Sequence, residues 1–140
     1  MKNNQNEANK ESFKIKSAWN SYICYLEKIL SMHKLFENLK VLDLSTVLAG
    51  PSVATFFAEL GAEVIKIESP GGDVTRSWKL PSEDPNDSIS AYFSSVNFKK
   101  KYLTLDLRSP KDHSILMQHI IDADILISNF KKGDAKKLNI

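Results

Sequence analysis

The chain has 140 residues, a formal net charge of +2 and 42% hydrophobic residues. This length suits one domain of common size and leaves too little chain for two sizeable cores. The composition is close to a globular average, which excludes wholesale disorder, and the charge is below the basic excess of a strong nucleic-acid binder.

The composition also bears on the compartment. No apolar stretch approaches the roughly 20 residues that cross a bilayer, so the sequence predicts no membrane span. Residues 1–12 are polar throughout and show no secretory signal. The single cysteine, Cys24, excludes an internal disulfide and a Cys-rich zinc site. We therefore expect a cytoplasmic protein.

Two kinds of segment are predicted before residue 37. Residues 1–12 have the composition of a disordered arm, and residues 13–36 form an amphipathic segment with a helix over 13–32 that Ser12 would cap. Apolar side chains recur there every three or four positions, as on one face of a helix. These residues are Ile15, Ala18, Trp19, Tyr22, Ile23, Leu26, Ile29 and Leu30. We expect this face to pack on protein rather than lie on a membrane.

From residue 40 onward, predicted strands alternate with predicted helices. Strands are expected at 40–44, 63–68, 102–107 and 124–129, and helices at 51–60, 88–96 and 110–123 and from about 134. This order predicts an α/β fold, a Rossmann-like parallel sheet with flanking helices. Because the last helix has barely begun, we expect the N-terminal half of a larger domain, and a complete small doubly wound domain is the alternative.

Ligands of open α/β sheets bind at the carboxyl ends of the strands, so the segments after each strand are candidate sites. After the first predicted strand, Gly50 allows a close backbone approach and Pro51 opens a helix whose first N–H groups suit an anion. The motif is neither a dinucleotide fingerprint nor a P-loop. A plain turn is an equal alternative.

Cations cluster near several strand ends. They are found in Lys99–Lys101, at Arg108 and in Lys131–Lys132. We expect them to form one basic rim suited to a ligand with several phosphates. The alternative is a solvated surface that keeps the protein soluble.

The longest irregular stretch, residues 69–88, follows the second predicted strand. We expect Asp73 and Arg76 to pin it as an ion pair. Trp78 either packs half-buried or covers a ligand. Glu68 stands where NAD-binding folds place a ribose-binding acid, but without the glycine fingerprint this match is accidental.

Other titratable residues give weaker signals. His33, His113 and His119 have no metal-ligand spacing, and no nucleophile grouping is visible. Cys24 is expected to serve packing. Asp43 and Asp106 lie inside predicted strands, and each is a candidate for a buried, hydrogen-bonded acid.

Three segments resemble, in order and spacing, the opening of the family III CoA-transferases. They read KVLDLSTVLAGPSVATFFAELGAEVIKIESPGGDVTRSW, SAYFSSVNFKKKYLTLDLRSPKD and DADILISNFKKGDAKKLNI. This family comprises the formyl-CoA and carnitine-CoA transferases and shares its fold with the α-methylacyl-CoA racemases. The resemblance covers residues 40–140, the N-terminal portion only, and implies coenzyme A as the ligand, bound as an acyl-CoA substrate, and no metal.

The resemblance also implies which positions contact CoA. They are Leu48, Ala49, Leu105, Asp106, Leu107, Arg108, Asn129, Phe130, Lys131 and Lys137. Four places depart from the family's usual residues. Leu48 stands for a frequent Gln and Ser69 for a frequent basic residue, while Lys99–Lys101 replaces Asn-Lys-Arg and residues 131–133 replace Arg-Pro-Gly.

The resemblance places the catalytic residues outside this chain. Family transferases use an aspartate that forms a mixed anhydride and then a CoA thioester. Its equivalent is expected beyond Ile140, as is the racemase acid/base pair, and family members form interlocked dimers. Residues 37–140 are thus expected to be an N-terminal CoA-binding segment resembling acyl-CoA:carboxylate CoA-transferases, inactive alone. A second chain would supply catalysis. The alternatives are a non-catalytic CoA or acyl-CoA-binding module, including a homodimer, and an inert truncated remnant.

Overall fold

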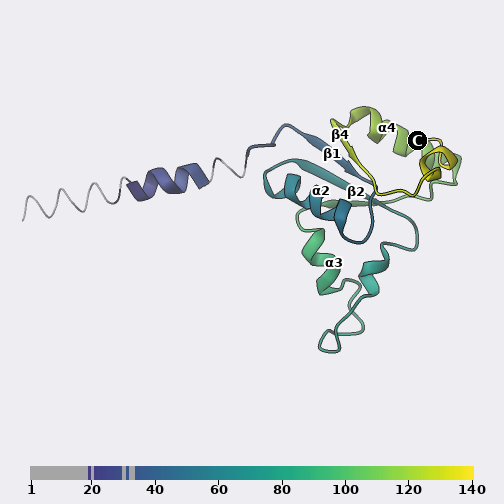
Figure 1. Ribbon diagram of the computed structural model, residues 1–140, viewed down its shortest axis with the longest axis horizontal. Helices are drawn as coiled ribbons and strands as arrows, with labels where there is room; N and C mark the ends of the chain where they lie inside the picture. The colour runs from purple at the N-terminus through teal and green to yellow at the C-terminus, as the bar shows by residue number, and fades with distance from the viewer. Residues whose placement is uncertain (1–18, 20, 30, 32–33) are drawn as a thin grey trace, which may run out of the picture. The chain divides into compact units, whose positions relative to one another are not determined.

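The structure is a computed structural model that describes residues 19, 21–29, 31 and 34–140 (Figure 1). The chain divides into two compact units, Met1–Lys34 and Leu35–Ile140.

In the first unit, residues 19, 21–29 and 31 are helical, in agreement with the predicted amphipathic helix. The rings of Trp19 and Tyr22 meet edge to face, with their centroids 6.3 Å apart. Cys24, for which packing was expected, is exposed. The predicted arm, the predicted cap at Ser12 and His33 lie outside the described residues.

The second unit is built on a parallel sheet of four strands in the order β3-β2-β1-β4. The strands are β1 (Lys40–Asp43), β2 (Glu63–Glu68), β3 (Lys101–Thr104) and β4 (Ile125–Ile127). In register, Leu42 of β1 lies between Ile65 of β2 and Leu126 of β4. The chain adds β2 and β3 on one side of β1 and then crosses to β4 on the other. The α/β class and the parallel sheet are as predicted.

The helices are α2 (Ala49–Glu59), α3 (Ala91–Val96), α4 (Pro110–Asp122) and α5 (Asp134–Lys137), with a short 3₁₀ helix η1 (Val74–Ser77). Ser90 caps α3 through a hydrogen bond from the Phe93 N–H to its side chain. Gly61, just past the end of α2, has a φ of 100°. This left-handed conformation is the one that a glycine just past a helix end commonly adopts.

Helices cover both faces of the sheet (Figure 1), and each face has its own core. Because side chains alternate along a strand, Val41 points to the α2 face and Leu42 to the α4 face. On the α2 face, Phe36 joins the core and lies 5.2 Å from the Phe57 ring centroid. On the α4 face, Leu116 is fully buried. The two cores fix the sheet that positions the strand ends.

Three predicted strands are shorter in the structure than expected, and β1 is shorter by one residue only. β3 ends at Thr104, so Asp106 lies beyond the strand and is not the buried strand acid that was predicted. Its partner is the exposed side chain of Arg108. β4 spans Ile125–Ile127 within the predicted 124–129.

Candidate functional site

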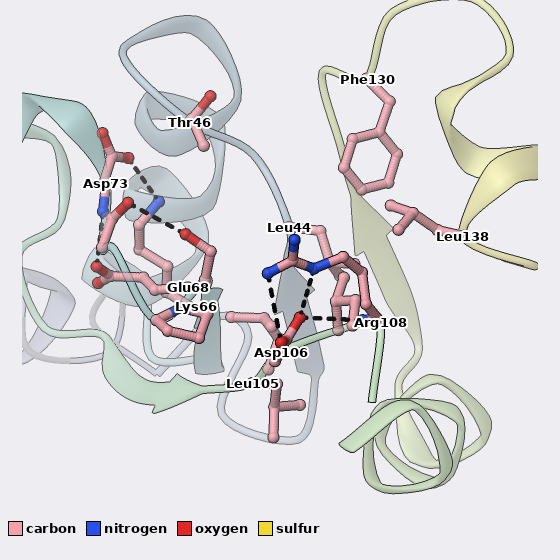
Figure 2. A pocket seen from close by; sticks show the side chains of 15 residues that line it. Leu44, Thr46, Lys66, Glu68, Asp73, Leu105, Asp106, Arg108, Phe130 and Leu138 are labelled. Carbon is pink, nitrogen blue, oxygen red and sulfur yellow. Dashed lines mark hydrogen bonds and ion pairs between the residues drawn. The ribbon is translucent and has the colours of Figure 1, made fainter. Parts of the chain in front are cut away.

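A cavity of about 330 Å³ lies where the four strands end (Figure 2). Segments after all four strands contribute to it. Its lining residues are Leu44, Thr46, Lys66, Ile67, Glu68, Ser69, Pro70, Gly72, Asp73, Leu105, Asp106, Leu107, Arg108, Phe130 and Leu138. The walls are mostly apolar, with a few polar groups, which is the usual character of a small-molecule site. Its place at the carboxyl ends of parallel strands is where such sheets bind ligands.

The structure brings half of the predicted contact residues to this cavity. Leu105, Asp106, Leu107 and Arg108 follow β3, and Phe130 follows β4. Figure 2 shows Phe130 and Leu138 on one side of the cavity and the charged group of Lys66, Glu68 and Asp73 on the other. The cavity thus has an apolar side and a charged side.

The other predicted contact residues do not line the cavity. Leu48 and Ala49 lie at the start of α2, where Leu48 is half exposed. Asn129 hydrogen-bonds the backbone of Thr46 through both amide atoms, at 3.0 and 2.8 Å. Lys137 pairs with Asp134 at 3.1 Å within the same short helix. Lys131 lies in the segment just before this helix, where its carbonyl accepts the Asp134 N–H.

Arg108 is the most accessible charge at the cavity. Its side chain is 85% exposed, and its Nε lies 3.0 Å from Oδ1 of Asp106. A second guanidinium nitrogen contacts Oδ2 at 3.4 Å. The hydrogen bond with Asp106 raises the pKa of Arg108 and lowers the pKa of Asp106. Because guanidinium carries five N–H donors, donors remain for a ligand oxygen.

The predicted basic rim is not formed by the lysines that were expected to form it. Lys101 begins β3 and pairs with Glu63 at the start of β2, at 2.6 Å. Residues at the start of a parallel strand lie away from the carboxyl ends, so this pair faces the opposite edge of the sheet. Lys99, Lys131 and Lys132 do not line the cavity. Among the described residues, the cations that line it are Lys66 and Arg108.

Lys100 is buried beneath the start of α2 and contacts four acceptors. Its Nζ lies 2.8 Å from Oδ2 of Asp43 and 2.8 Å from the Pro51 carbonyl. It also contacts the carbonyl of Val96 and the side chain of Asn97, at 3.0 and 2.9 Å. Burial lowers the pKa of Lys100, and this effect outweighs the attraction of Asp43. Asp43 is the buried, hydrogen-bonded acid that the sequence predicted.

The predicted ion pair between Asp73 and Arg76 is wrong. Arg76 donates two hydrogen bonds to Glu68, at 2.8 and 2.7 Å, which raise the pKa of Arg76. Asp73 instead lies 3.1 Å from Lys66, and both side chains are almost fully buried. Lys66 and Glu68 are two residues apart on β2 and therefore point to the same side. This i, i+2 spacing is the signal that the sequence analysis overlooked.

Asp73 remains ionised in this buried position. Burial is the largest single influence and opposes ionisation. The N–H and hydroxyl of Thr75 and the charge of Lys66 together outweigh it and lower the pKa of Asp73. Lys66 also donates to the carbonyl of Ser45 at 2.7 Å. This buried pair thus connects β2 with the loop after β1.

Gly50 and Trp78 make contacts with protein. A Cβ at Gly50 would collide with the Ser45 side chain, so the close approach predicted there is made to Ser45. Trp78 packs against Tyr92 with ring centroids 5.1 Å apart and does not line the cavity. Of the two alternatives, packing is the one observed.

The histidines form no metal site within the described part of the chain. His113 contacts the carbonyl of Leu138 through Nε2 at 2.8 Å. His119 borders a separate hollow at the start of β1 and β2. Across the same residues, no helix is long and apolar enough to cross a membrane.

Comparison with known proteins identifies the family to which this fold belongs. The family model described as CoA-transferase family III matches residues 36–140. The chain belongs to CoA-transferase family III. The resemblance to this family that the sequence showed is therefore confirmed.

Two curated relatives of this family III chain illustrate the match. A succinyl-CoA:mesaconate CoA-transferase of Haloarcula hispanica is 39% identical over 104 residues, which are 74% of this chain and 26% of that protein. A succinyl-CoA:glutarate CoA-transferase of Mus musculus is 37% identical over 108 residues, which are 76% of this chain and 24% of that protein. The chain thus spans about a quarter of the length of these relatives.

Solved structures agree with the family III fold. A CAIB/BAIF family protein from Brucella suis is 37% identical, with a TM-score of 0.66, over 74% of this chain and 28% of that chain. The orthorhombic form of Rv3272 from Mycobacterium tuberculosis is 34% identical, with a TM-score of 0.68. The match covers 75% of this chain and 29% of that chain.

Proposed function

We propose that residues 37–140 bind coenzyme A, as CoA or as an acyl-CoA substrate, with one part of it in the cavity at the strand ends. The observation that carries this proposal is the lining of the cavity, which joins Leu105–Arg108 and Phe130. These residues come from segments that lie far apart in the sequence, and the family resemblance implies CoA contacts at each of them.

The chemistry of the lining supports a nucleotide thiol ester as ligand. Leu44, Leu105 and Phe130 offer apolar walls for an adenine ring or for the pantetheine chain. Arg108 offers a forked cation to a phosphate. CoA is too large for a cavity of about 330 Å³, so only part of the molecule enters. We assign the remaining contacts to Leu48, Ala49, Asn129, Lys131 and Lys137.

We further propose that residues 37–140 do not transfer CoA by themselves. Transfer between carboxylic acids requires the nucleophilic aspartate that the family resemblance places beyond Ile140. A second chain would supply that half, in a cytoplasmic assembly. The runner-up is a non-catalytic module that binds CoA or acyl-CoA, alone or as a homodimer.

Calorimetric titration of the folded, soluble chain with CoA tests the proposal. We expect saturable binding, and we expect Arg108→Ala to weaken it about tenfold because a charge-assisted hydrogen bond is lost. Lys101→Ala is the matched control. It removes another exposed, carboxylate-paired cation, at the opposite edge of the sheet.

Two outcomes would contradict the proposal. If the folded chain does not bind CoA, the cavity is not by itself a CoA site. If Arg108→Ala and Lys101→Ala weaken binding equally, the effect is one of net charge, and Arg108 is not at the ligand. Light scattering of the same sample separates a defined monomer or dimer from an aggregating remnant.

A further inference from the structure

The loop between β1 and α2 contains a strained residue. Val47 has a φ of 71°, in the left-handed region that β-branched residues rarely adopt. Strain of this kind persists only where the surroundings enforce it, and it is common at ligand-binding positions. The next two residues are Leu48 and Ala49, the first predicted contacts with CoA.

Asp73 makes the contact that holds this residue. Its Oδ2 accepts the N–H of Val47 at 3.3 Å and lies 3.1 Å from Nζ of Lys66. Its Oδ1 accepts the N–H and the hydroxyl of Thr75, at 3.0 and 2.8 Å. The side chain is only 1% exposed. One oxygen thus caps η1, and the other faces the strained loop.

The two residues before Val47 are also fixed, but by other groups. Lys66 donates to the carbonyl of Ser45 at 2.7 Å, and Asn129 bonds both backbone groups of Thr46. Asp73 contacts this loop through the hydrogen bond that it accepts from the Val47 N–H. Without that acceptor, Val47 would relax toward the extended conformation that its side chain prefers. The start of α2 would then turn away from its present direction.

We propose that Asp73 is a positioning residue that holds Val47 in the left-handed conformation and thereby pre-forms the turn that presents Leu48 and Ala49. Its effect on CoA affinity rests on the function proposed above. The carboxylate suits this role because both of its oxygens accept hydrogen bonds. An asparagine would keep one acceptor for Thr75 and turn an N–H₂ group toward the Val47 N–H.

The first measurement uses the unmodified chain and needs no ligand. Amide hydrogen exchange followed by NMR should show the Val47 N–H to be protected. In Asp73→Asn its exchange should be at least tenfold faster. Because this variant leaves the Lys66 ammonium buried without its counter-charge, Lys66→Met/Asp73→Asn is measured beside it.

The second measurement is a rescue. Glycine adopts a positive φ without steric cost, so Val47→Gly no longer needs the contact that Asp73 provides. In each folded Asp73→Asn background we expect CoA affinity to fall at least tenfold, and Val47→Gly to restore most of that loss. Val74→Gly, which alters an exposed valine with an ordinary φ, is the control and should restore none.

The outcomes separate this inference from the proposed function. A parent chain that does not bind CoA overturns the proposed function, and Val47 exchange then decides the positioning role. An unprotected Val47 amide in the parent, or exchange unchanged by Asp73→Asn, overturns that role whatever CoA does. So does a loss of affinity that Val47→Gly fails to restore or that Val74→Gly restores equally, because Asp73 would then act through general stability.

Discussion

At Gly50 a Cβ atom would collide with the side chain of Ser45, which is fully buried. We expect Gly50→Ala to lower the free energy of unfolding by about 1–3 kcal/mol, as overpacking does in a dense core. Gly71→Ala is the control, since the nearest atom to its Cβ would be Ser69 Oγ at 3.9 Å. Urea denaturation measures both. Equal midpoints for the two variants would show that the loop moves aside freely.

Lys100 and Lys101 are adjacent lysines in opposite environments. The side chains of Lys100 and Asp43 are fully buried, whereas that of Lys101 is 70% exposed. Lys100→Met leaves a buried carboxylate without its counter-charge and should cost about 3–5 kcal/mol of unfolding free energy, whereas Lys101→Met should change it little. The double variant Lys100→Met/Asp43→Asn should recover part of the loss. A loss in the double variant as large as in Lys100→Met would show that the charge pairing is not the cause.

The environment of a single residue could be predicted where it depends on the secondary structure in which the residue lies. Asp43, at the end of a buried strand, was correctly predicted to be a buried acid. Its partner Lys100 lies 57 positions away and is brought to it by the fold, which local patterns do not report. The same reason explains why Asp73 was assigned to Arg76, three residues away, although its partner is Lys66 on β2.

At the scale of elements, helix starts depend on whether the capping side chain is used. Ser90 accepts the Phe93 N–H at 2.9 Å and donates to the Thr75 carbonyl at 2.6 Å, so it joins α3 to η1. Ser109 occupies the same position before α4 but makes no capping hydrogen bond. We expect Ser90→Ala to lower the unfolding free energy by about 1–2 kcal/mol and Ser109→Ala to lower it by much less.

Urea midpoints of the two serine variants measure this difference. Equal losses would mean that the intrinsic preference for serine at a helix start matters more than the hydrogen bonds of Ser90. A loss confined to Ser90→Ala would show that the hydrogen bonds of Ser90, to Phe93 and to Thr75, stabilise the fold.

The order and type of elements followed from periodicity, because alternating strands and helices bury one face each. Their ends did not. β3 ends at Thr104, although the apolar alternation in the sequence continues to Leu107. Leu105 and Leu107 line the cavity and pack on the core of the α4 face, and they do not extend the strand pairing with β2. Lys101 was placed at the wrong edge of the sheet, although a residue that begins a parallel strand lies away from the carboxyl ends.

For the whole molecule, the sheet order β3-β2-β1-β4 is what brings the site together. The sequence predicted a site at the carboxyl ends of the strands, where the cavity lies. Arg108 and Phe130, which were predicted as contact residues, line this cavity. Its charged side was not predicted, because Lys66 and Asp73 look like surface residues in the sequence and are buried only after β2 and its following loop pack together. Long-range pairing of charges is decided by tertiary structure.

The same buried charges should make the stability of the molecule depend on pH. The pKa of Asp73 is lowered in the folded state, where Thr75 and Lys66 favour the carboxylate against the effect of burial. Such a group contributes stability that is fully present above the unfolded pKa of about 4 and is lost as pH falls through the lower folded pKa. We therefore expect the urea midpoint of the parent chain to fall steeply below about pH 4.

The variant Lys66→Met/Asp73→Asn isolates this contribution, because neither replacement titrates in the acid range. Asp106, Glu83 and Glu63 also have lowered pKa values, but they are in contact with solvent, which screens them, and they are present in both proteins. The urea midpoint of the double variant should thus fall less between pH 5 and pH 3 than that of the parent. Equal slopes would mean that the Asp73 carboxyl titrates alike in the folded and unfolded chain, and its pairing with Lys66 would then contribute no acid-sensitive stability.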